Sequence, residues 1–130
     1  MNTKLRNPES HLLAAIRLAL GREPDLVLWR NAAGVAIHAQ TGNTQKFGLA
    51  AGATDLIGIL TVGRVGVFVA IEVKTATGRL TREQELFGAL VSRRGGVYGV
   101  ARSVPDAIGI IERARDTLRL QVVVDDAGNR

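Results

Sequence analysis

One stretch decides the fold of this chain: DLIGILTVGRVGVFVAIEVK, residues 55–74. The apolar run at residues 56–60 predicts a short buried strand, and residues 65–74, which are rich in valine and isoleucine, predict a longer one. Between the two runs, Val62-Gly63-Arg64 is typical of a hairpin turn. The stretch therefore predicts two strands that are joined as a hairpin.

Upstream of this hairpin, the sequence predicts a helix and further strands. Asn7-Pro8-Glu9 combines an N-cap residue, a proline at the first helical position and a first-turn acid, so we expect a helix over residues 8–20. Residues 26–30 predict a strand, and residues 34–38 are expected to pair with it. A glycine-rich connection over residues 40–53 then leads to the hairpin.

Downstream of the hairpin, two more helices and a strand are expected. Thr81-Arg82-Glu83-Gln84 matches a capping box, and the helix that it opens is expected to end near Arg94. Residues 97–101 predict a strand. Ser103-Val104-Pro105-Asp106 opens a last helix, which we expect to continue to about residue 118.

The order of the predicted elements is helix, three or four strands, helix, strand and helix. The helical crossover between the later strands predicts an α/β fold, with a mixed β-sheet flanked by helices. A chain of 130 residues suits a single domain, residues 1–130. Its core is expected at about residues 8–118, and residues 119–130 are expected to form a C-terminal tail with an edge strand at residues 122–124.

The composition excludes some kinds of site and favours a polyanionic partner. The chain has no cysteine, which excludes disulfides and thiolate zinc sites, and two histidines, His11 and His38, are too few for a histidine metal cluster. The net charge of +5 and the pI of about 10.7 favour nucleic acid as the partner. Aromatic residues make up 4% of the chain, so phosphate contacts are expected rather than base stacking.

No apolar run reaches the length of about 20 residues that a membrane span needs. The N-terminal segment MNTKLRNPES is polar and lacks the apolar stretch of a signal peptide. We therefore expect a soluble protein that does not associate with a membrane and is not exported from the cytoplasm.

Chemistry is expected where the second strand of the hairpin ends. Because side chains alternate between the faces of a strand, Glu72 and Lys74 share a face, and burying them is costly unless they are paired or bind a metal ion. Glu-x-Lys alone is a common tripeptide, for which a simple ion pair at a solvated strand end is the more frequent interpretation. Asp55 changes this balance, because the short turn places it opposite the far end of the second strand, close to Glu72. Two carboxylates beside one lysine favour a cation between the acids.

Two further polar side chains are candidates for the same site. Glu9 shares a helix stripe with Leu12 and Ile16 and is expected to point at the core, although a first-turn acid also complements the helix dipole. Gln84 is expected to point inward from the helix that follows the hairpin, although it also completes the capping box. For both residues the structural and the functional interpretation stay open.

The candidate ligands are all oxygen atoms, which suits a hard cation, Mg²⁺ or Mn²⁺. Beside a phosphodiester, such an ion lowers the pKa of a bound water and neutralises charge on the phosphoryl oxygens. A nearby lysine holds the attacking water or stabilises the pentavalent phosphorus. No P-loop, Gly-x-Ser-x-Gly or His-Glu-x-x-His motif competes with this site.

An ordered series of motifs resembles the VRR-NUC (virus-type replication-repair nuclease) branch of the PD-(D/E)XK superfamily. The series comprises Arg30-Asn31-Ala32-Ala33-Gly34, Phe47-Gly48-Leu49, Gly52-Ala53-Thr54-Asp55-Leu56, Ile71-Glu72-Val73-Lys74 and the highly specific Gly78-Arg79-Leu80-Thr81-Arg82-Glu83-Gln84. The resemblance covers about residues 8–105, and its one departure is Thr54, where the family often has serine or proline. It implies the restriction-endonuclease-like core of that superfamily, with the element order αβββαβ.

The resemblance implies a role for the residues of the hairpin. Asp55 and Glu72 would bind the metal ion, together with the backbone carbonyl of Val73. Lys74 would position the attacking water. These roles describe a hydrolase that acts on ester bonds, a Mg²⁺- or Mn²⁺-dependent endodeoxyribonuclease.

The resemblance extends to the flanking helices and to the assembly. Glu9 would correspond to the acidic residue of the family's first helix and serve a second metal ion, and Gln84 would correspond to a supporting glutamine. Standalone chains of this form are seen in phages and bacteria, which implies the cytoplasm of a bacterium or of a phage-infected host cell. They resemble Holliday-junction resolvases, which implies a homodimer that acts on branched DNA in replication, repair and recombination.

Basic residues around the site are candidates for gripping the DNA backbone, although each of them also suits a solvated surface. They are Arg30, Lys46, Arg79 and Arg82. The function that we expect is a metal-dependent, structure-selective DNA endonuclease. Two alternatives stay open: a non-catalytic nucleic-acid-binding module on the same fold, and a sequence-specific restriction-type endonuclease, for which the sequence shows no dedicated base-reading segment.

Overall fold

The structure, a computed structural model, describes residues 7–128 of the chain. In chain order its elements are α1 (Pro8–Leu20), β1 (Leu26–Arg30), β2 (Gly34–Ile37), β3 (Thr44–Phe47), β4 (Leu56–Val62), β5 (Val65–Val73), α2 (Arg82–Arg93), β6 (Val97–Ala101) and α3 (Val104–Gly128). With β2 and β3 set aside, the order is the predicted αβββαβ core, followed by α3. The α/β class is therefore confirmed.

The hairpin of β4 and β5 lies at the centre of a four-stranded sheet with the strand order β1-β4-β5-β6. β1 pairs antiparallel with β4, and β4 pairs antiparallel with β5, where Leu56 lies opposite Ile71. β6 is parallel to β5, because α2 supplies the crossover connection that a parallel pair needs. The sheet is therefore mixed, as the sequence predicts.

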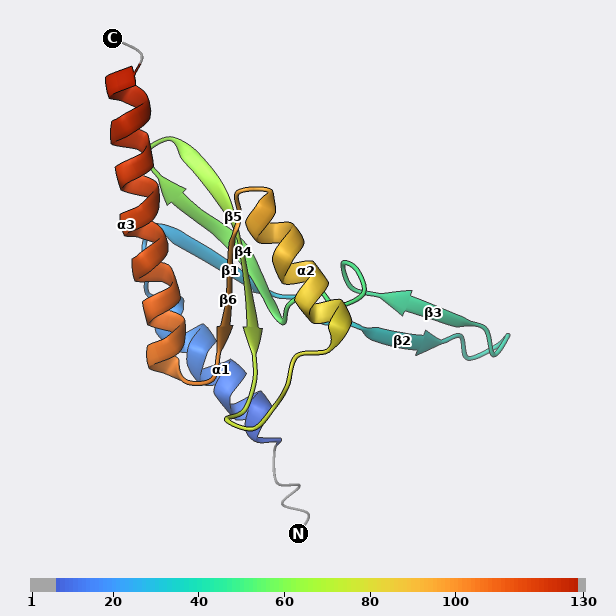
Figure 1. Ribbon diagram of the computed structural model, residues 1–130. Helices are drawn as coiled ribbons and strands as arrows, with labels where there is room; N and C mark the ends of the chain where they lie inside the picture. The colour runs from blue at the N-terminus through green and yellow to red at the C-terminus, as the bar shows by residue number, and fades with distance from the viewer. Residues whose placement is uncertain (1–6, 129–130) are drawn as a thin grey trace.

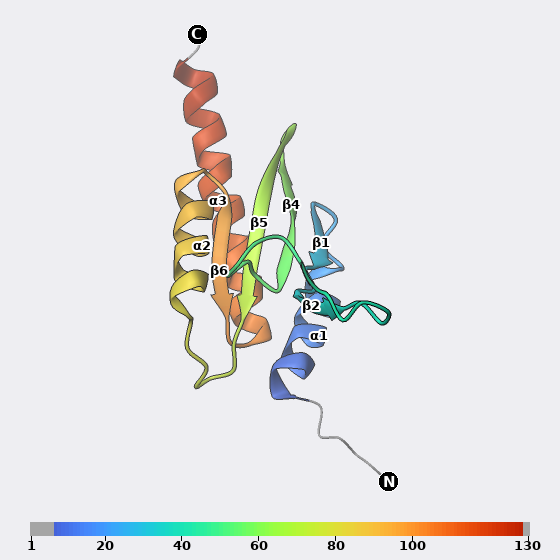
Figure 2. The ribbon, with the colours of Figure 1, turned by 90° about the vertical axis from the view of Figure 1, so that its right-hand side faces the viewer.

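Helices cover both faces of this sheet, as Figures 1 and 2 show. α1 and α3 pack against one face, where the main core forms around fully buried side chains such as Ile16, Leu60 and Ile71. α2 covers the other face beside β5 and β6. Gly88 allows this close approach, because a Cβ atom at its position would meet the ring of Tyr98 in β6 at 2.4 Å.

The helix starts that the sequence predicts are confirmed. The Asn7 side chain caps α1 by accepting a hydrogen bond of 3.1 Å from the backbone N–H of Glu9. Thr81 and Gln84 form the capping box of α2, and after this helix the chain turns at Gly95, whose φ is +87°. Glu9 and Gln84 both lie in the first turn of their helices. The caps therefore also fix the backbone positions from which these two candidate side chains extend.

One predicted strand pairing is wrong. β2 does not pair with β1 but with β3, which lies inside the segment predicted to be a glycine-rich connection. β1 pairs instead with β4, where Leu26 lies opposite Leu60 and is buried. The physical reason is burial. Pairing with β4 buries Leu26 of β1 in the core, whereas every residue of β2 and β3 is exposed, so pairing β2 with β1 would bury no apolar side chain of β2.

The last helix is longer than predicted, and the edge strand is wrong. α3 continues to Gly128, so residues 122–124 are helical. No glycine or proline interrupts residues 110–127, so each further residue adds a helical hydrogen bond at little cost. The predicted C-terminal tail is therefore part of α3 as far as residue 128.

Candidate metal centre

The register of the hairpin brings Asp55 and Glu72 together. Leu56 lies opposite Ile71, so the next position along the ladder places Asp55 opposite Glu72. Because side chains alternate along a strand, both carboxylates belong to the face that α2 covers rather than to the main core. Asp55 Oδ2 also accepts a hydrogen bond of 2.9 Å from the backbone N–H of Val73.

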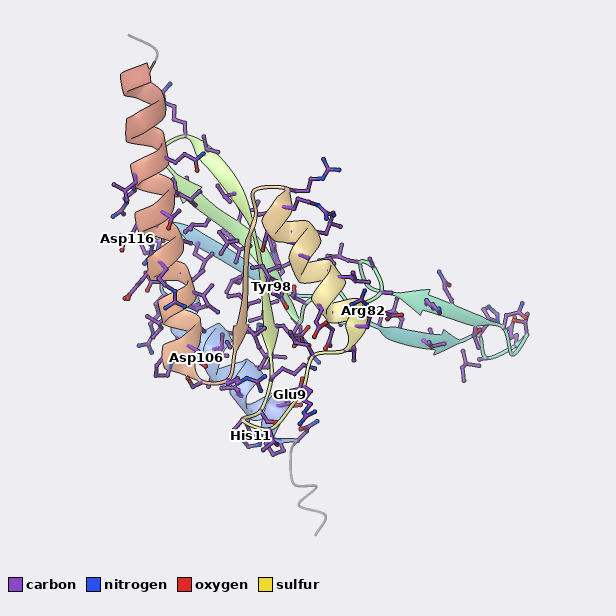
Figure 3. All side chains as sticks on the ribbon, viewed as in Figure 1. Glu9, His11, Arg82, Tyr98, Asp106 and Asp116 are labelled. Carbon is purple, nitrogen blue, oxygen red and sulfur yellow. The ribbon has the colours of Figure 1, made fainter. Side chains whose placement is uncertain are left out.

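Glu9 approaches the same point from the first turn of α1. One carboxylate oxygen each from Glu9, Asp55 and Glu72 lies within 4.8 Å of the other two. Figure 3 shows Glu9 at the end of the sheet, below the start of α2. Glu9 and Asp55 are half-buried, whereas Glu72 is 2% exposed. Three carboxylates that are distant in the chain therefore form one cluster, which solvent reaches from the outer side.

Glu72 is the electrostatic centre of this acid cluster. Burial, followed by the neighbouring carboxylates of Asp55 and Glu9, raises the pKa of Glu72 to about 9, while the charge of Lys74 lowers it. Glu72 Oε2 is buried and has no hydrogen-bond partner among the residues described. A divalent cation supplies both the opposite charge and the partner that this oxygen lacks, so the donor set fits a hard metal ion.

Lys74 follows directly after β5. Its backbone N–H donates to Ala101 O at 3.0 Å, which extends the β5–β6 ladder by one residue. Its half-buried side chain lies close enough to Glu72 for the ammonium charge to lower the Glu72 pKa. The structure therefore brings the lysine to the acid cluster.

An open cavity of about 750 Å³ leads to the two strand acids. Gln84 and Lys46 border this cavity together with Asp55 and Glu72. Gln84 Oε1 accepts a hydrogen bond of 2.9 Å from the backbone N–H of Thr81, which confirms its capping role. Gln84 thus lines the cavity while its side-chain oxygen accepts the capping hydrogen bond from Thr81. Its functional role stays a prediction.

The four basic residues predicted to grip DNA are all exposed. Lys46 lines the large cavity, and Arg30 lines a smaller one of about 210 Å³ on the other side of the acid cluster. Arg82 begins α2 (Figure 3), and Arg79 lies in the loop before it. Of the four residues, Arg30 and Lys46 thus line a cavity that also contains at least one of the acids.

Asn31 holds the start of β4, a role that the sequence did not reveal. Its backbone N–H donates to Asp55 O at 2.8 Å, and its side-chain Nδ2 donates to Thr54 O at 3.1 Å. Thr54 is itself buried, and its hydroxyl donates to Leu56 O at 2.8 Å. These bonds position the backbone that carries the Asp55 carboxylate. The signal for Asn31 was its place in one of the family motifs.

Arg102 holds the loop after Lys74 and carries no local sequence signal. Its Nη1 donates to the carbonyls of Thr75 and Gly78 at 2.6 and 2.7 Å. These contacts join residues that are 27 and 24 positions apart, so no local pattern predicts them. Arg102 therefore fixes the connection between β5 and α2 through the carbonyls of Thr75 and Gly78.

Tyr98 is a third residue near the site whose role the sequence did not indicate. It lies on the same face of the sheet as Glu72, since the β5–β6 ladder pairs Ala70 with Tyr98 and Glu72 with Val100. Burial raises the pKa of Tyr98, and the charges of Glu72 and Glu85 raise it too. Its hydroxyl is buried and has no hydrogen-bond partner within residues 7–128. Tyr98, which Figure 3 labels, is therefore a neutral phenol on the same face of the sheet as Glu72.

An αβββαβ core whose central hairpin carries clustered acids defines a nuclease fold of the PD-(D/E)XK type. A family model for the VRR-NUC domain matches residues 2–105, which is most of the chain. The chain therefore belongs to the VRR-NUC family, a family of nucleases, and the resemblance drawn from its motifs is confirmed. A comparison with curated proteins found no match. Among residues 7–128, no helix combines the length and the apolar character that crossing a membrane requires.

Proposed function

We propose that this protein is a metal-dependent, structure-selective DNA endonuclease that hydrolyses phosphodiester bonds in branched DNA such as Holliday junctions. One observation carries the proposal: three carboxylates meet within 4.8 Å around Glu72, which is 2% exposed. Such a cluster is costly in the metal-free protein and suits a reaction that depends on a cation. Membership of a nuclease family supports the same function.

Mg²⁺ or Mn²⁺ is the ion that these ligands suit, because all the donors are oxygen atoms. Asp55, Glu72 and the backbone carbonyl of Val73 would hold it, and Glu9 would serve a second ion. When bound, such an ion lowers the pKa of a water molecule and neutralises the charge that develops on the phosphate. The unpartnered oxygen of Glu72 supports this assignment.

The remaining side chains would orient the reacting groups. Lys74 carries a positive charge beside Glu72 and would hold the attacking water or stabilise the phosphoryl oxygens. The hydrogen bond from Val73 N–H engages one oxygen of Asp55, which leaves the other oxygen for the ion. Gln84 borders the cavity at the N-terminus of α2, where the helix dipole favours the phosphate anion.

Exposed basic residues would hold the DNA backbone on either side of the acids. Arg30 and Lys46 border the two cavities, and Arg79 and Arg82 extend the positive surface along the start of α2. The net charge of +5 supports a polyanionic substrate. Binding through phosphate contacts weakens steeply as the salt concentration rises, which makes the salt dependence a simple measure of these contacts.

We also propose that the single domain acts as a homodimer in the cytoplasm of a bacterium or of a phage-infected cell. Two-fold symmetry would place two sites on two strands of a branched substrate. The family resemblance is the support for this assembly.

A cleavage panel tests the proposed function. The protein is incubated with Mg²⁺, Mn²⁺ or a chelator on four-way junctions, flaps, single strands and linear duplex. We expect metal-dependent cleavage of the branched substrates and no cleavage with the chelator. Salt-sensitive binding without cleavage under either metal would make the chain a non-catalytic binding module, and cutting of linear duplex at one recognition site would make it a restriction-type enzyme.

A further inference from the structure

The β2–β3 ribbon leaves the body of the protein as an arm. We call residues 34–47 the β2–β3 arm; Figure 1 shows it projecting beyond α2, away from the main sheet. Every residue of both strands is exposed, and within residues 7–128 the two strands pair with no strand other than each other. An isolated two-stranded ribbon is marginally stable in water, so an arm of this kind is suited to binding a partner.

The tip of the arm has a defined conformation. His38 N–H donates to Asn43 O at 2.8 Å, and His38 Nδ1 accepts from the backbone N–H groups of Gln40 and Thr41, both at 3.3 Å. Gly42 completes the turn with a φ of +70°. These bonds use the backbone of the tip and leave its exposed side-chain amides directed at solvent. The arm therefore presents hydrogen-bonding side chains from an organised turn.

The charge of the arm favours a polyanion. Residues 31–54 contain no aspartate or glutamate, although the whole chain has 12 of them. Lys46 adds a positive charge on β3. The arm and its two connections to the sheet therefore carry no carboxylate that would repel a polyanion.

The base of the arm is part of the wall of the candidate active site. Val35 and Lys46, which are opposite each other in the ribbon, line the same cavity of about 750 Å³ as Asp55 and Glu72. A substrate that reaches these acids through the cavity therefore passes the base of the arm.

We propose that the β2–β3 arm inserts into a groove of duplex DNA next to the phosphodiester that is cut. This inference rests on the proposed nuclease function and adds the surface that holds the substrate. The major groove of B-DNA admits a two-stranded ribbon, and neutral amides hydrogen-bond base edges there. Gln40, Asn43 and Gln45 supply such amides, and Ile37, which is 72% exposed, supplies an apolar contact for thymine methyl groups or sugars.

A charge-matched pair of variants tests the arm. Asn43→Asp with Gln45→Glu places two carboxylates on the arm without changing the shape of either side chain. Thr117→Asp with Gln121→Glu lowers the net charge equally on the exposed surface of α3. Fluorescence anisotropy measures the binding of a labelled duplex to each variant in a chelator at low salt. We expect the arm variant to bind about tenfold more weakly than the α3 variant, because its carboxylates face the phosphates.

Two control measurements check that both variants fold and that the arm variant keeps its metal site. Circular dichroism melting checks that both variants fold like the parent protein. Titration with Mn²⁺ in a calorimeter reports the acid cluster separately, and the arm variant is expected to bind Mn²⁺ like the parent. If the parent protein neither binds Mn²⁺ nor cleaves DNA, the proposed function is wrong. The comparison of duplex binding between the arm variant and the α3 variant still tests the arm in that case.

Site-specific crosslinking identifies the partner directly. The chain has no cysteine, so Ala39→Cys gives one thiol at the exposed tip, and Thr117→Cys gives a matched thiol on α3. A photoreactive thiol reagent is attached, and the labelled duplex is added before illumination. We expect a protein–DNA adduct from position 39 and none from position 117. Equal duplex affinity of the two charge variants, or a protein–protein adduct from position 39, would overturn the inference, and the adduct would assign the arm to a second copy of the chain.

Discussion

The Asp55 carboxylate accepts a hydrogen bond of 2.9 Å from the backbone N–H of Val73, so the start of β4 is tied to the end of β5 directly beside Glu72. This bond is both structural and chemical, because it engages one of the two Asp55 carboxylate oxygens directly beside Glu72. Two variants separate these roles. Asp55→Asn keeps an acceptor oxygen, whereas Asp55→Ala removes it, and both remove the same charge.

We expect Asp55→Ala to unfold at lower urea than Asp55→Asn, by about 1 kcal/mol in the free energy of unfolding, because only the alanine leaves Val73 N–H without its partner. Urea denaturation in a chelator measures the difference. Both variants are expected to lose Mn²⁺ binding, which calorimetry reports. Equal stability of the two variants would contradict the role given to this hydrogen bond.

Glu72→Gln is expected to stabilise the metal-free protein while it abolishes cleavage. The substitution keeps the shape of the side chain and supplies a permanent hydrogen-bond donor near Asp55. It also removes the proton uptake that folding requires at neutral pH, because burial and the neighbouring carboxylates raise the pKa of Glu72 to about 9. The melting temperature in a chelator is expected to rise by a few degrees, and the cleavage rate to fall by at least about a hundredfold. Glu112→Gln, on the exposed surface of α3, is the control and is expected to change neither quantity. A Glu72→Gln variant that cuts at the parent rate would end the site assignment.

Mn²⁺ or Mg²⁺ is expected to raise the melting temperature of the parent protein, because the ion binds the folded acid cluster and not the unfolded chain. At a concentration one hundred times the dissociation constant, the gain is about 2.7 kcal/mol. Scanning calorimetry over a range of metal concentrations measures it, and a chelator is expected to reverse it. In Glu72→Gln the same titration is expected to be flat; a rise there equal to that of the parent would place the ion elsewhere.

The ion pair between Arg115 and Asp25 predicts a specific dependence of stability on pH. Arg115 donates two hydrogen bonds of 2.7 Å to the Asp25 carboxylate, and these bonds, together with its charge, lower the pKa of Asp25 below 3.8. Because the pKa is lower in the folded state, the stabilisation is complete above the unfolded-state pKa of about 3.9 and is lost as the pH falls through the folded-state pKa.

Arg115→Met keeps the packing of the stem and removes the charge. We expect the parent protein to exceed this variant in stability by about 1 kcal/mol at pH 6, since the pair is partly exposed, and the difference to shrink below pH 4. Urea unfolding at a series of pH values tests this. A difference that stays constant down to pH 2 would show that packing, not the ion pair, sets the effect.

Gly52 is expected to be required for the packing of residues 48–53, the loop that lines the large cavity, against α2. Its φ is +78°, and a Cβ atom there would meet the Glu83 carbonyl at 2.3 Å. Gly63 is a matched control, with a φ of +61° and open space around the position of a Cβ atom. We expect Gly63→Ala to cost about 1 kcal/mol and Gly52→Ala roughly 3 kcal/mol, with a loss of cleavage only for Gly52→Ala. Equal costs in urea unfolding would mean that the loop is free to move away from α2.

Local patterns predicted the parts of the site that lie on one hairpin. A short turn at Gly63 and strict alternation along two strands are sufficient to place Asp55 opposite Glu72, because both distances are set by the strand repeat. The capping signals at Asn7 and Thr81 were equally reliable, since a helix start depends on residues within one turn. The same local patterns misplaced β2, because its choice of partner depends on which strand offers burial.

Patterns along the chain were sufficient to predict the hairpin, the helix starts and the types of side chain at the site, and the motifs identified the nuclease family. Three features follow from the packing of distant segments instead: Glu9 reaches the two strand acids, Arg102 binds the loop after Lys74, and the β2–β3 arm lies outside the main sheet. The physical reason is the separation along the chain. Contacts within a few residues follow from the backbone repeat, whereas contacts across tens of residues depend on how helices and sheet bury their apolar faces together.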